Sequence, residues 1–124
     1  KSFLFHNNRD GTFTDVTQKA TLDKDGRAMG ALAVDYDNDG FSDLFLANDN
    51  SPNFLYHNNH DGTFTDVSVK SGIAAHPSKG MGVAFADVDG DGFIDIFVAN
   101  DSMRNFLFRK TVNRFPEHAL FIAE

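Results

Sequence analysis

Two segments of this sequence each occur twice at almost the same separation, and this repeat restricts the possible fold more than any other feature. HNNRDGTFTDV begins at His6 and returns as HNNHDGTFTDV at His57, with ten of eleven positions identical. DYDNDGFSDLFLAND begins at Asp35 and returns as DVDGDGFIDIFVAND at Asp87, with ten of fifteen positions identical. The separations are 51 and 52 residues, so the 124 residues contain two repeat units and part of a third. A fixed period of this length is typical of architectures in which each unit is one supersecondary structure.

Every local signal within one unit indicates β-structure. A run of small apolar residues, GALAV at 30–34, precedes an aspartate-rich loop, and the apolar strand DLFLAN follows it. The short turn DNSPN leads to FLYHN, and an Asp-Gly turn joins FLYHN to FTDVS. Four antiparallel strands per unit at this period predict an all-β fold of β-propeller blades. The alternative is a β-sandwich or an open meander, but identical loops at a fixed period favour the propeller.

The repeat predicts one partial-propeller domain over residues 1–124. Residues 1–20 form the outer hairpin of a preceding blade, 29–69 a full blade, and 81–124 a second blade. The outer hairpin of the second blade is degraded to RKTVNRFPEH, where Pro116 indicates an outermost strand because proline is tolerated mainly at sheet edges. Since about three or more repeats are usually needed to complete a core, we expect further blades, either from a longer chain or from other copies in a homo-oligomer or filament.

The charge of the chain is concentrated in its loops and excludes some partners. The formal net charge is −7, and the acidic residues are 16 Asp and only 2 Glu. Aspartate is favoured in turns and metal loops rather than in strands. A negative chain is a poor ligand for a nucleic-acid backbone, so no nucleic-acid partner is expected. No apolar run approaches the ~18 residues of a membrane span. The absence of cysteine excludes disulfides and cysteine-ligated metal sites.

The two aspartate-rich loops are candidate metal sites, because each places four carboxylates within nine residues. Carboxylates at positions 1, 3, 5 and 9 converge if the chain wraps once around a point, glycine at position 6 permits the turn, and the carbonyl at position 7 adds an oxygen. The predicted ligands are Asp35, Asp37, Asp39, Phe41 and Asp43 in the first loop, and Asp87, Asp89, Asp91, Phe93 and Asp95 in the second.

Calcium is the cation that this ligand set favours. Clustered carboxylates repel one another, and a hard divalent cation with several oxygen ligands removes that repulsion. Mg²⁺ prefers fewer protein ligands and strict octahedral geometry, so we predict one Ca²⁺ in each loop. The loops are not EF-hands, because position 12 is Leu46 or Val98 instead of glutamate. Tight turns without a metal are the alternative explanation of such Asp-Gly sequences.

The histidines offer no obvious second site. His6 and His57 occupy the same repeat position, which favours a structural role in the hairpin. His60, His76 and His118 depart from the repeat, but nothing in the sequence places them together, so zinc is disfavoured. With two glutamates, no cysteine and the aspartate clusters explained by repeated loops, we expect no enzyme. The alternatives are a glycan-binding lectin or part of a polysaccharide lyase or hydrolase.

The loops and their flanking strands resemble FG-GAP/VCBS repeats, the blades of integrin α-chain-like propellers. ADVDGDGFIDIFVAN, NFLYHNNHDGTFTDV and the Gly-Met-Gly before the second copy are similar to ASPIC/UnbV-type, cartilage acidic protein-like propellers. The resemblance covers nearly the whole chain. It implies a seven-bladed propeller with Ca²⁺ in the blade hairpins. It also implies a secreted, cell-surface or periplasmic setting, and a role in adhesion or recognition of a protein or glycan.

Overall fold

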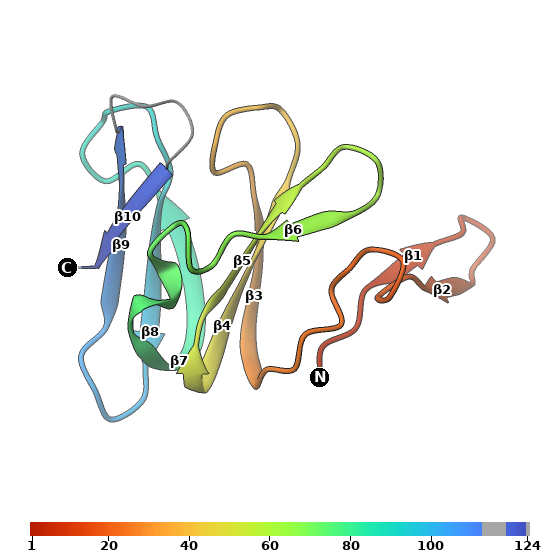
Figure 1. Ribbon diagram of the computed structural model, residues 1–124, viewed down its shortest axis with the longest axis horizontal. Helices are drawn as coiled ribbons and strands as arrows, with labels where there is room; N and C mark the ends of the chain where they lie inside the picture. The colour runs from red at the N-terminus through yellow and green to blue at the C-terminus, as the bar shows by residue number, and fades with distance from the viewer. Residues whose placement is uncertain (113–118, 124) are drawn as a thin grey trace.

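The computed structural model describes residues 1–112 and 119–123, which form antiparallel β-structure with one short 3-10 helix (Figure 1). The all-β fold class is confirmed. The elements in chain order are β1 (Phe5–Asn7), β2 (Phe13–Asp15), β3 (Ala28–Val34), β4 (Asp43–Pro52), β5 (Phe54–Asn58), β6 (Phe64–Asp66), η1 (Ile73–Ala75), β7 (Pro77–Ala86), β8 (Asp95–Asn100), β9 (Phe106–Val112) and β10 (Ala119–Ala123). Within these described residues, no helix is long and apolar enough to cross a membrane.

Equivalent positions of the sequence repeat have equivalent strand pairings in the structure. Strands β3 to β6 pair in order in the middle of Figure 1, and β7 to β10 pair in order at its left side. Phe45 on β4 faces Leu32 on one side and Leu55 on the other. Its counterpart Phe97 on β8 faces Ala84 and Leu107, which lie 52 residues after Leu32 and Leu55. These two groups are partial propeller blades, and we call them blade 1 (β3–β6) and blade 2 (β7–β10).

Strand β4 is longer than the sequence indicates. The predicted turn DNSPN is the end of β4, whose Asp49 pairs with Lys79 and whose Pro52 pairs with Pro77 of β7. Two asparagine side chains close the bend that follows, because Asn53 accepts the Asn48 backbone N–H at 3.0 Å and Asn48 donates to the Pro52 carbonyl at 2.7 Å. The backbone of 49–52 is therefore available to β7, and one sheet continues from blade 1 into blade 2.

The predicted outer hairpin of blade 2 lies only partly within the described residues. Strand β9 runs to Val112, and β10 pairs with it from Ala119 to Ala123. Pro116, predicted to lie in the outermost strand, falls outside the described residues. The division into 1–20, 29–69 and 81–124 stays a prediction.

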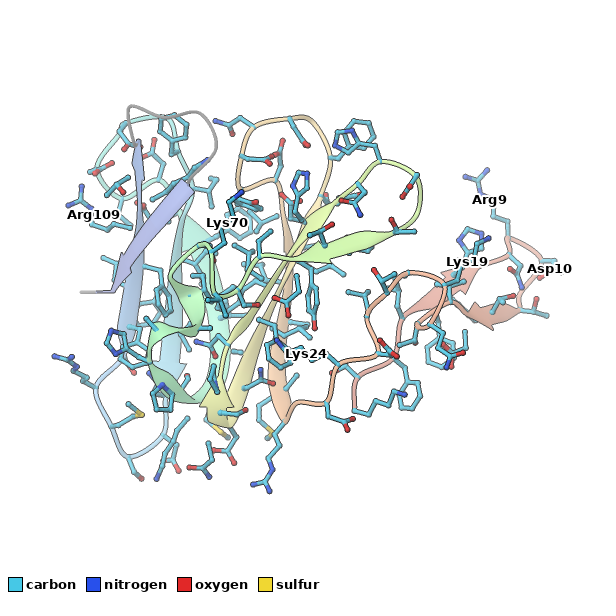
Figure 2. All side chains as sticks on the ribbon, in the orientation of Figure 1. Arg9, Asp10, Lys19, Lys24, Lys70 and Arg109 are labelled. Carbon is cyan, nitrogen blue, oxygen red and sulfur yellow. The ribbon has the colours of Figure 1, made fainter. Side chains whose placement is uncertain are left out.

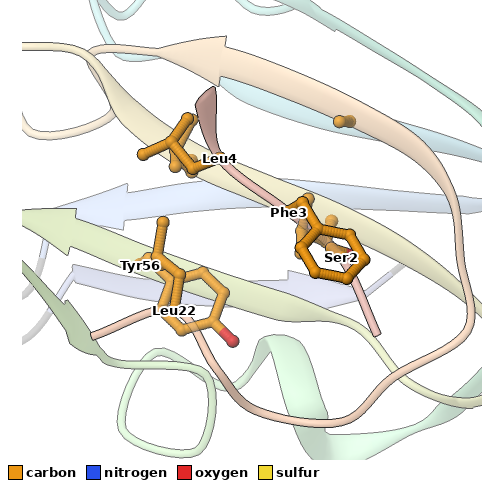
Figure 3. Close-up of a pocket in the computed structure, with 8 residues that line it drawn as sticks. Ser2, Phe3, Leu4, Leu22 and Tyr56 are labelled. Carbon is orange, nitrogen blue, oxygen red and sulfur yellow. The ribbon is translucent and has the colours of Figure 1, made fainter. Parts of the chain in front are cut away.

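The two faces of β4 are covered by different hydrophobic clusters. Phe45 and Ala47 pack between the blades, in a cluster that also contains Ile96, Val98, Phe106 and Phe108. Leu44 and Leu46 lie on the other face, against Ala20, Leu22, Phe54 and Tyr56. Coverage of both faces explains why DLFLAN is apolar at successive positions instead of alternating. An apolar pocket of about 120 Å³ beside the second cluster is lined by residues that include Phe3, Leu4, Leu22 and Tyr56 (Figure 3).

Small residues allow the first strands of the two blades to approach closely. A Cβ atom added at Gly30 of β3 would lie 3.4 Å from a Val83 methyl group and 3.5 Å from the Gly82 Cα of β7. A Cβ added at Gly80 would lie 2.9 Å from the Cβ of Ala47. A side chain at Gly80 would therefore collide with blade 1, whereas at Gly30 a Cβ would only come into van der Waals contact with β7.

Candidate metal centre

The two aspartate-rich loops lie at the same edge of the molecule, at the top of Figure 1. Loop 1 (residues 35–43) joins β3 to β4, and loop 2 (residues 87–95) joins β7 to β8. Each is the turn of an antiparallel hairpin, so equivalent positions in the two blades are presented in the same way. The sequence repeat thus produces two neighbouring candidate sites.

The first aspartate of each loop organises the turn. The Asp35 carboxylate accepts the N–H of Asp39 at 3.1 Å and that of Gly40 at 2.9 Å. The Asp87 carboxylate accepts the equivalent N–H groups of Asp91 and Gly92 at the same distances. Gly40 and Gly92 have φ angles of 89° and 87°, which only glycine adopts without strain. The chain therefore wraps around the carboxylates as the spacing predicts.

The last aspartate of each loop is a buried anchor. Asp43 accepts the N–H of Tyr36 at 3.1 Å and that of Asn58 at 2.8 Å. Asp95 accepts the N–H of Val88 at 3.0 Å and that of Lys110 at 2.8 Å. Each carboxylate joins the start of its loop to the third strand of its blade. Burial raises the pKa of Asp43 to about 6, so its charge is disfavoured in the absence of a cation.

The structure brings together three of the predicted carboxylates in each loop. Asp35, Asp37 and Asp39 each offer an oxygen within 4.8 Å of the others, and so do Asp87, Asp89 and Asp95. Asp43 belongs to a separate group with Asp37 and His57. Asp91 enters no such group among the described residues, and its Oδ1 accepts the Phe93 N–H at 2.9 Å. A role for the Phe41 and Phe93 carbonyls stays a prediction.

The second aspartate of loop 1 has a carboxylate oxygen in an unusual environment. Oδ1 of Asp37 is buried and has no hydrogen-bond partner among the described residues. Burial and the neighbouring Asp39 raise the pKa of Asp37 above its ordinary value. Buried acceptors of this kind are rare, because an unsatisfied polar atom destabilises the fold. A divalent cation between these carboxylates would satisfy the atom and relieve the repulsion, so the residues fit a metal.

Two histidines lie against loop 1, a position that the sequence did not predict for them. His57, at the end of β5, places Nδ1 3.1 Å from Asp37 Oδ2 and 3.4 Å from Asp43 Oδ1. His60 places Nε2 2.6 Å from Asp39 Oδ2, and its ring stacks on Phe41 with centroids 3.8 Å apart. His57 thus lies against the loop, whereas the sequence favoured a role within its own hairpin. His76 lies elsewhere, 6.1 Å from the Phe106 ring, and His118 lies outside the described residues.

Loop 2 has an arginine where loop 1 has a histidine. Arg109 follows His57 by 52 residues, and its guanidinium donates to Asp89 Oδ2 (Figure 2, left). This hydrogen bond lowers the pKa of Asp89 below its ordinary value. The two loops therefore have aspartates at the same positions, but the side chain beside the second aspartate is a histidine in loop 1 and an arginine in loop 2.

Two contacts connect the loops to each other. The buried Lys110 of β9 donates from Nζ to the Tyr36 carbonyl in loop 1, and it lies 4.6 Å from the centroid of the Phe93 ring in loop 2. Asn38 of loop 1 donates to the Gly92 carbonyl of loop 2 at 3.2 Å. Burial lowers the pKa of Lys110, although Asp37, Asp35 and other nearby carboxylates oppose this shift. These contacts make loop 1 and loop 2 direct neighbours in the structure.

Comparison with known proteins supports the resemblance seen in the loops. The chain matches the FG-GAP-like repeat over residues 1–46 and 35–98. It is similar to cartilage acidic protein 1 of Homo sapiens, with 38% identity over 86 residues, which are 69% of this chain and 13% of that protein. The Xenopus tropicalis protein of the same name is 41% identical over 75 residues, or 60% of this chain and 11% of that protein. The chain thus spans only a small part of the length of these relatives.

Proposed function

We propose that this chain, which belongs to the family of FG-GAP-like repeats, is a calcium-binding propeller segment that holds one Ca²⁺ in each of its two aspartate loops. The observation that carries the proposal is the convergence of three carboxylates in both loops, with a buried Asp37 oxygen that has no partner among the described residues. Ca²⁺ accepts six to eight oxygen ligands in flexible geometry, which suits mixed carboxylates and carbonyls on a wrapped loop.

The bound ion would act by stabilising the blades. It would neutralise carboxylates that repel one another and fix the turn between the first two strands of each blade. Because Lys110 and Asn38 connect the loops, ordering of one site should favour ordering of the other. In this proposal the chain performs no chemistry of its own and acts as a structural or recognition module. Activity on a polysaccharide panel would contradict it.

The family and the relatives support a setting outside the cytoplasm. We propose a secreted, cell-surface or periplasmic location, where calcium modules commonly bind with dissociation constants of about 10⁻⁴–10⁻³ M. A protein or glycan would be recognised by the faces of the completed propeller. Similarity to long relatives supports further blades from a longer chain.

Assembly of several copies is the other way to supply further blades, and the mass in solution tests it. Exposed aromatic side chains on blade 2, Phe85 and Phe97, would then be covered by a second copy. Light scattering should show species heavier than 13.7 kDa that increase with concentration. A stable monomer at all concentrations excludes this route.

Calcium should stabilise the chain, and its removal should lower the melting temperature. Binding to the folded state alone contributes about 2.7 kcal/mol per site at a hundredfold excess over the dissociation constant. Calorimetric titration should give two Ca²⁺ per chain. Because Arg109 must release Asp89 when the ion binds, loop 2 should be the weaker site.

Single substitutions should remove the calcium sites one at a time. Asp39→Ala should abolish the site in loop 1 and Asp91→Ala the site in loop 2. Asp61→Ala is the matched control, since Asp61 carries the same charge but caps a hairpin turn through Thr63. An identical melting temperature in calcium and in EDTA would overturn the proposal.

A further inference from the structure

We propose that loop 1 also contains a site for a first-row transition metal, formed by Asp39, His57 and His60, and that Zn²⁺ binds there. This inference goes beyond the calcium proposal and does not depend on it, because it rests on the two imidazoles. A ring nitrogen of each histidine and one Asp39 oxygen all lie within 4.8 Å of one another. Two histidines and a carboxylate are a common ligand set for zinc.

The distances need only a small adjustment to coordinate the ion. Ligand atoms of tetrahedral zinc lie about 3.3 Å apart, given bonds of about 2.0–2.1 Å. His60 Nε2 and Asp39 Oδ2 are 2.6 Å apart, so they would separate slightly as the metal replaces the proton between them. The ring of His57, 6.1 Å from that of His60 between centroids, would move toward them.

The surroundings of His57 point independently to a cation. Its buried Nδ1 lies between two carboxylates, 3.1 Å from Asp37 Oδ2 and 3.4 Å from Asp43 Oδ1, without hydrogen-bond geometry to either. The unpartnered Oδ1 of Asp37 belongs to the first of these carboxylates. An unsatisfied buried polar atom destabilises the folded state. The carboxylates that surround this imidazole make the region favourable for a positive ion.

His60 is held in position for this role. Its backbone adopts a φ of 65°, and its N–H donates to the Asn58 side chain at 2.9 Å. Its ring lies almost parallel to that of Phe41, with an interplanar angle of 17°. The turn and the stacking together direct Nε2 toward Asp39. A bound metal would join the outer hairpin of blade 1 to loop 1.

The repeat supplies an internal comparison, because only its middle copy offers two imidazoles. The first copy has His6 and Arg9 at these positions, and the third has Arg109 and Val112. The guanidinium of Arg109 donates to Asp89 and cannot ligate a metal. Loop 2 therefore presents only oxygen ligands. The proposed zinc site is a property of loop 1 and not of the repeat.

Zinc titration of the untagged full chain tests the inference. Competition with a chromophoric chelator should show one Zn²⁺ per chain, and His57→Asn or His60→Asn should weaken binding at least tenfold. His76→Asn is the matched control, because His76 is an exposed histidine remote from the loop, and it should leave the affinity unchanged. Co²⁺ in place of Zn²⁺ should give the visible absorption of a tetrahedral complex, which is lost in His60→Asn.

Parallel calcium titrations separate this inference from the calcium proposal. His60→Asn should retain two Ca²⁺ per chain, which also shows that the variant is folded. If the wild-type chain binds no Zn²⁺ in the chelator competition, the inference fails and the calcium proposal is unaffected. An equal loss of Zn²⁺ affinity in His60→Asn and His76→Asn would also overturn the inference.

Discussion

Replacement of Asp43 by alanine should lower the free energy of unfolding by about 2–6 kcal/mol even in EDTA. The Asp43 side chain is fully buried and accepts the backbone N–H groups of Tyr36 and Asn58. Its removal leaves both donors unsatisfied in the interior, and each would cost about 1–3 kcal/mol. Urea denaturation of the metal-free chain measures the difference.

Two further variants distinguish the anchoring role of Asp43 from its charge. Asp43→Asn keeps one acceptor and should lose less stability in EDTA than Asp43→Ala. Because burial raises the pKa of Asp43 to about 6, ionisation of this carboxyl opposes folding above that pH until a cation is present. Asp39→Ala removes a more exposed carboxylate and should be nearly neutral without metal. A loss below about 1 kcal/mol for Asp43→Ala would show that the hydrogen bonds are not what holds the loop.

Replacement of Phe45 by alanine should cost about 3–5 kcal/mol, because it opens a cavity between the blades. The ring is completely buried, and its centroid lies 6.4 Å from that of Phe108 in blade 2. The cost combines the lost transfer free energy of the ring with the cavity that remains. Equilibrium denaturation of dilute protein in EDTA measures it without a contribution from the metal.

The repeat provides the control for this substitution. Phe97 occupies the same position in blade 2 but is 41% exposed, since no further blade covers it among the described residues. Phe97→Ala should therefore cost about 1 kcal/mol or less, as for most exposed sites. If the two substitutions were equally destabilising, the cluster between the blades would not be the main core of this chain.

The parts of the structure that the sequence predicts are those determined locally. Identical blocks around Phe45 and Phe97 impose the same strand pairings, so the repeat is sufficient to predict the blades. The spacing of the aspartates and of Gly40 is sufficient to predict a wrapped loop. Both inferences depend on residues within one hairpin, where side-chain direction follows directly from the strand period.

The position of His57 and His60 beside loop 1 depends on the pairing of β5 with β4. Strand β5 runs antiparallel to β4, with Tyr56 opposite Leu44, so the residues after Tyr56 lie beside the start of β4 where loop 1 ends. The antiparallel strand order together with the departure of His60 from the repeat could have revealed this. The extension of β4 to Pro52 was not accessible in this way, because it requires β7 as a partner.

The two blades are fastened at opposite ends of their shared boundary. At one end Pro52 pairs with Pro77, and at the other Lys110 and Asn38 cross from one loop to the other. If the blades were attached at one end alone, that attachment would act as a hinge and the other end could open. Because they are attached at both ends, the blades separate only when one attachment breaks. Slow amide exchange of Phe45 and its neighbours would therefore report the breaking of that attachment, not a gradual separation of the blades.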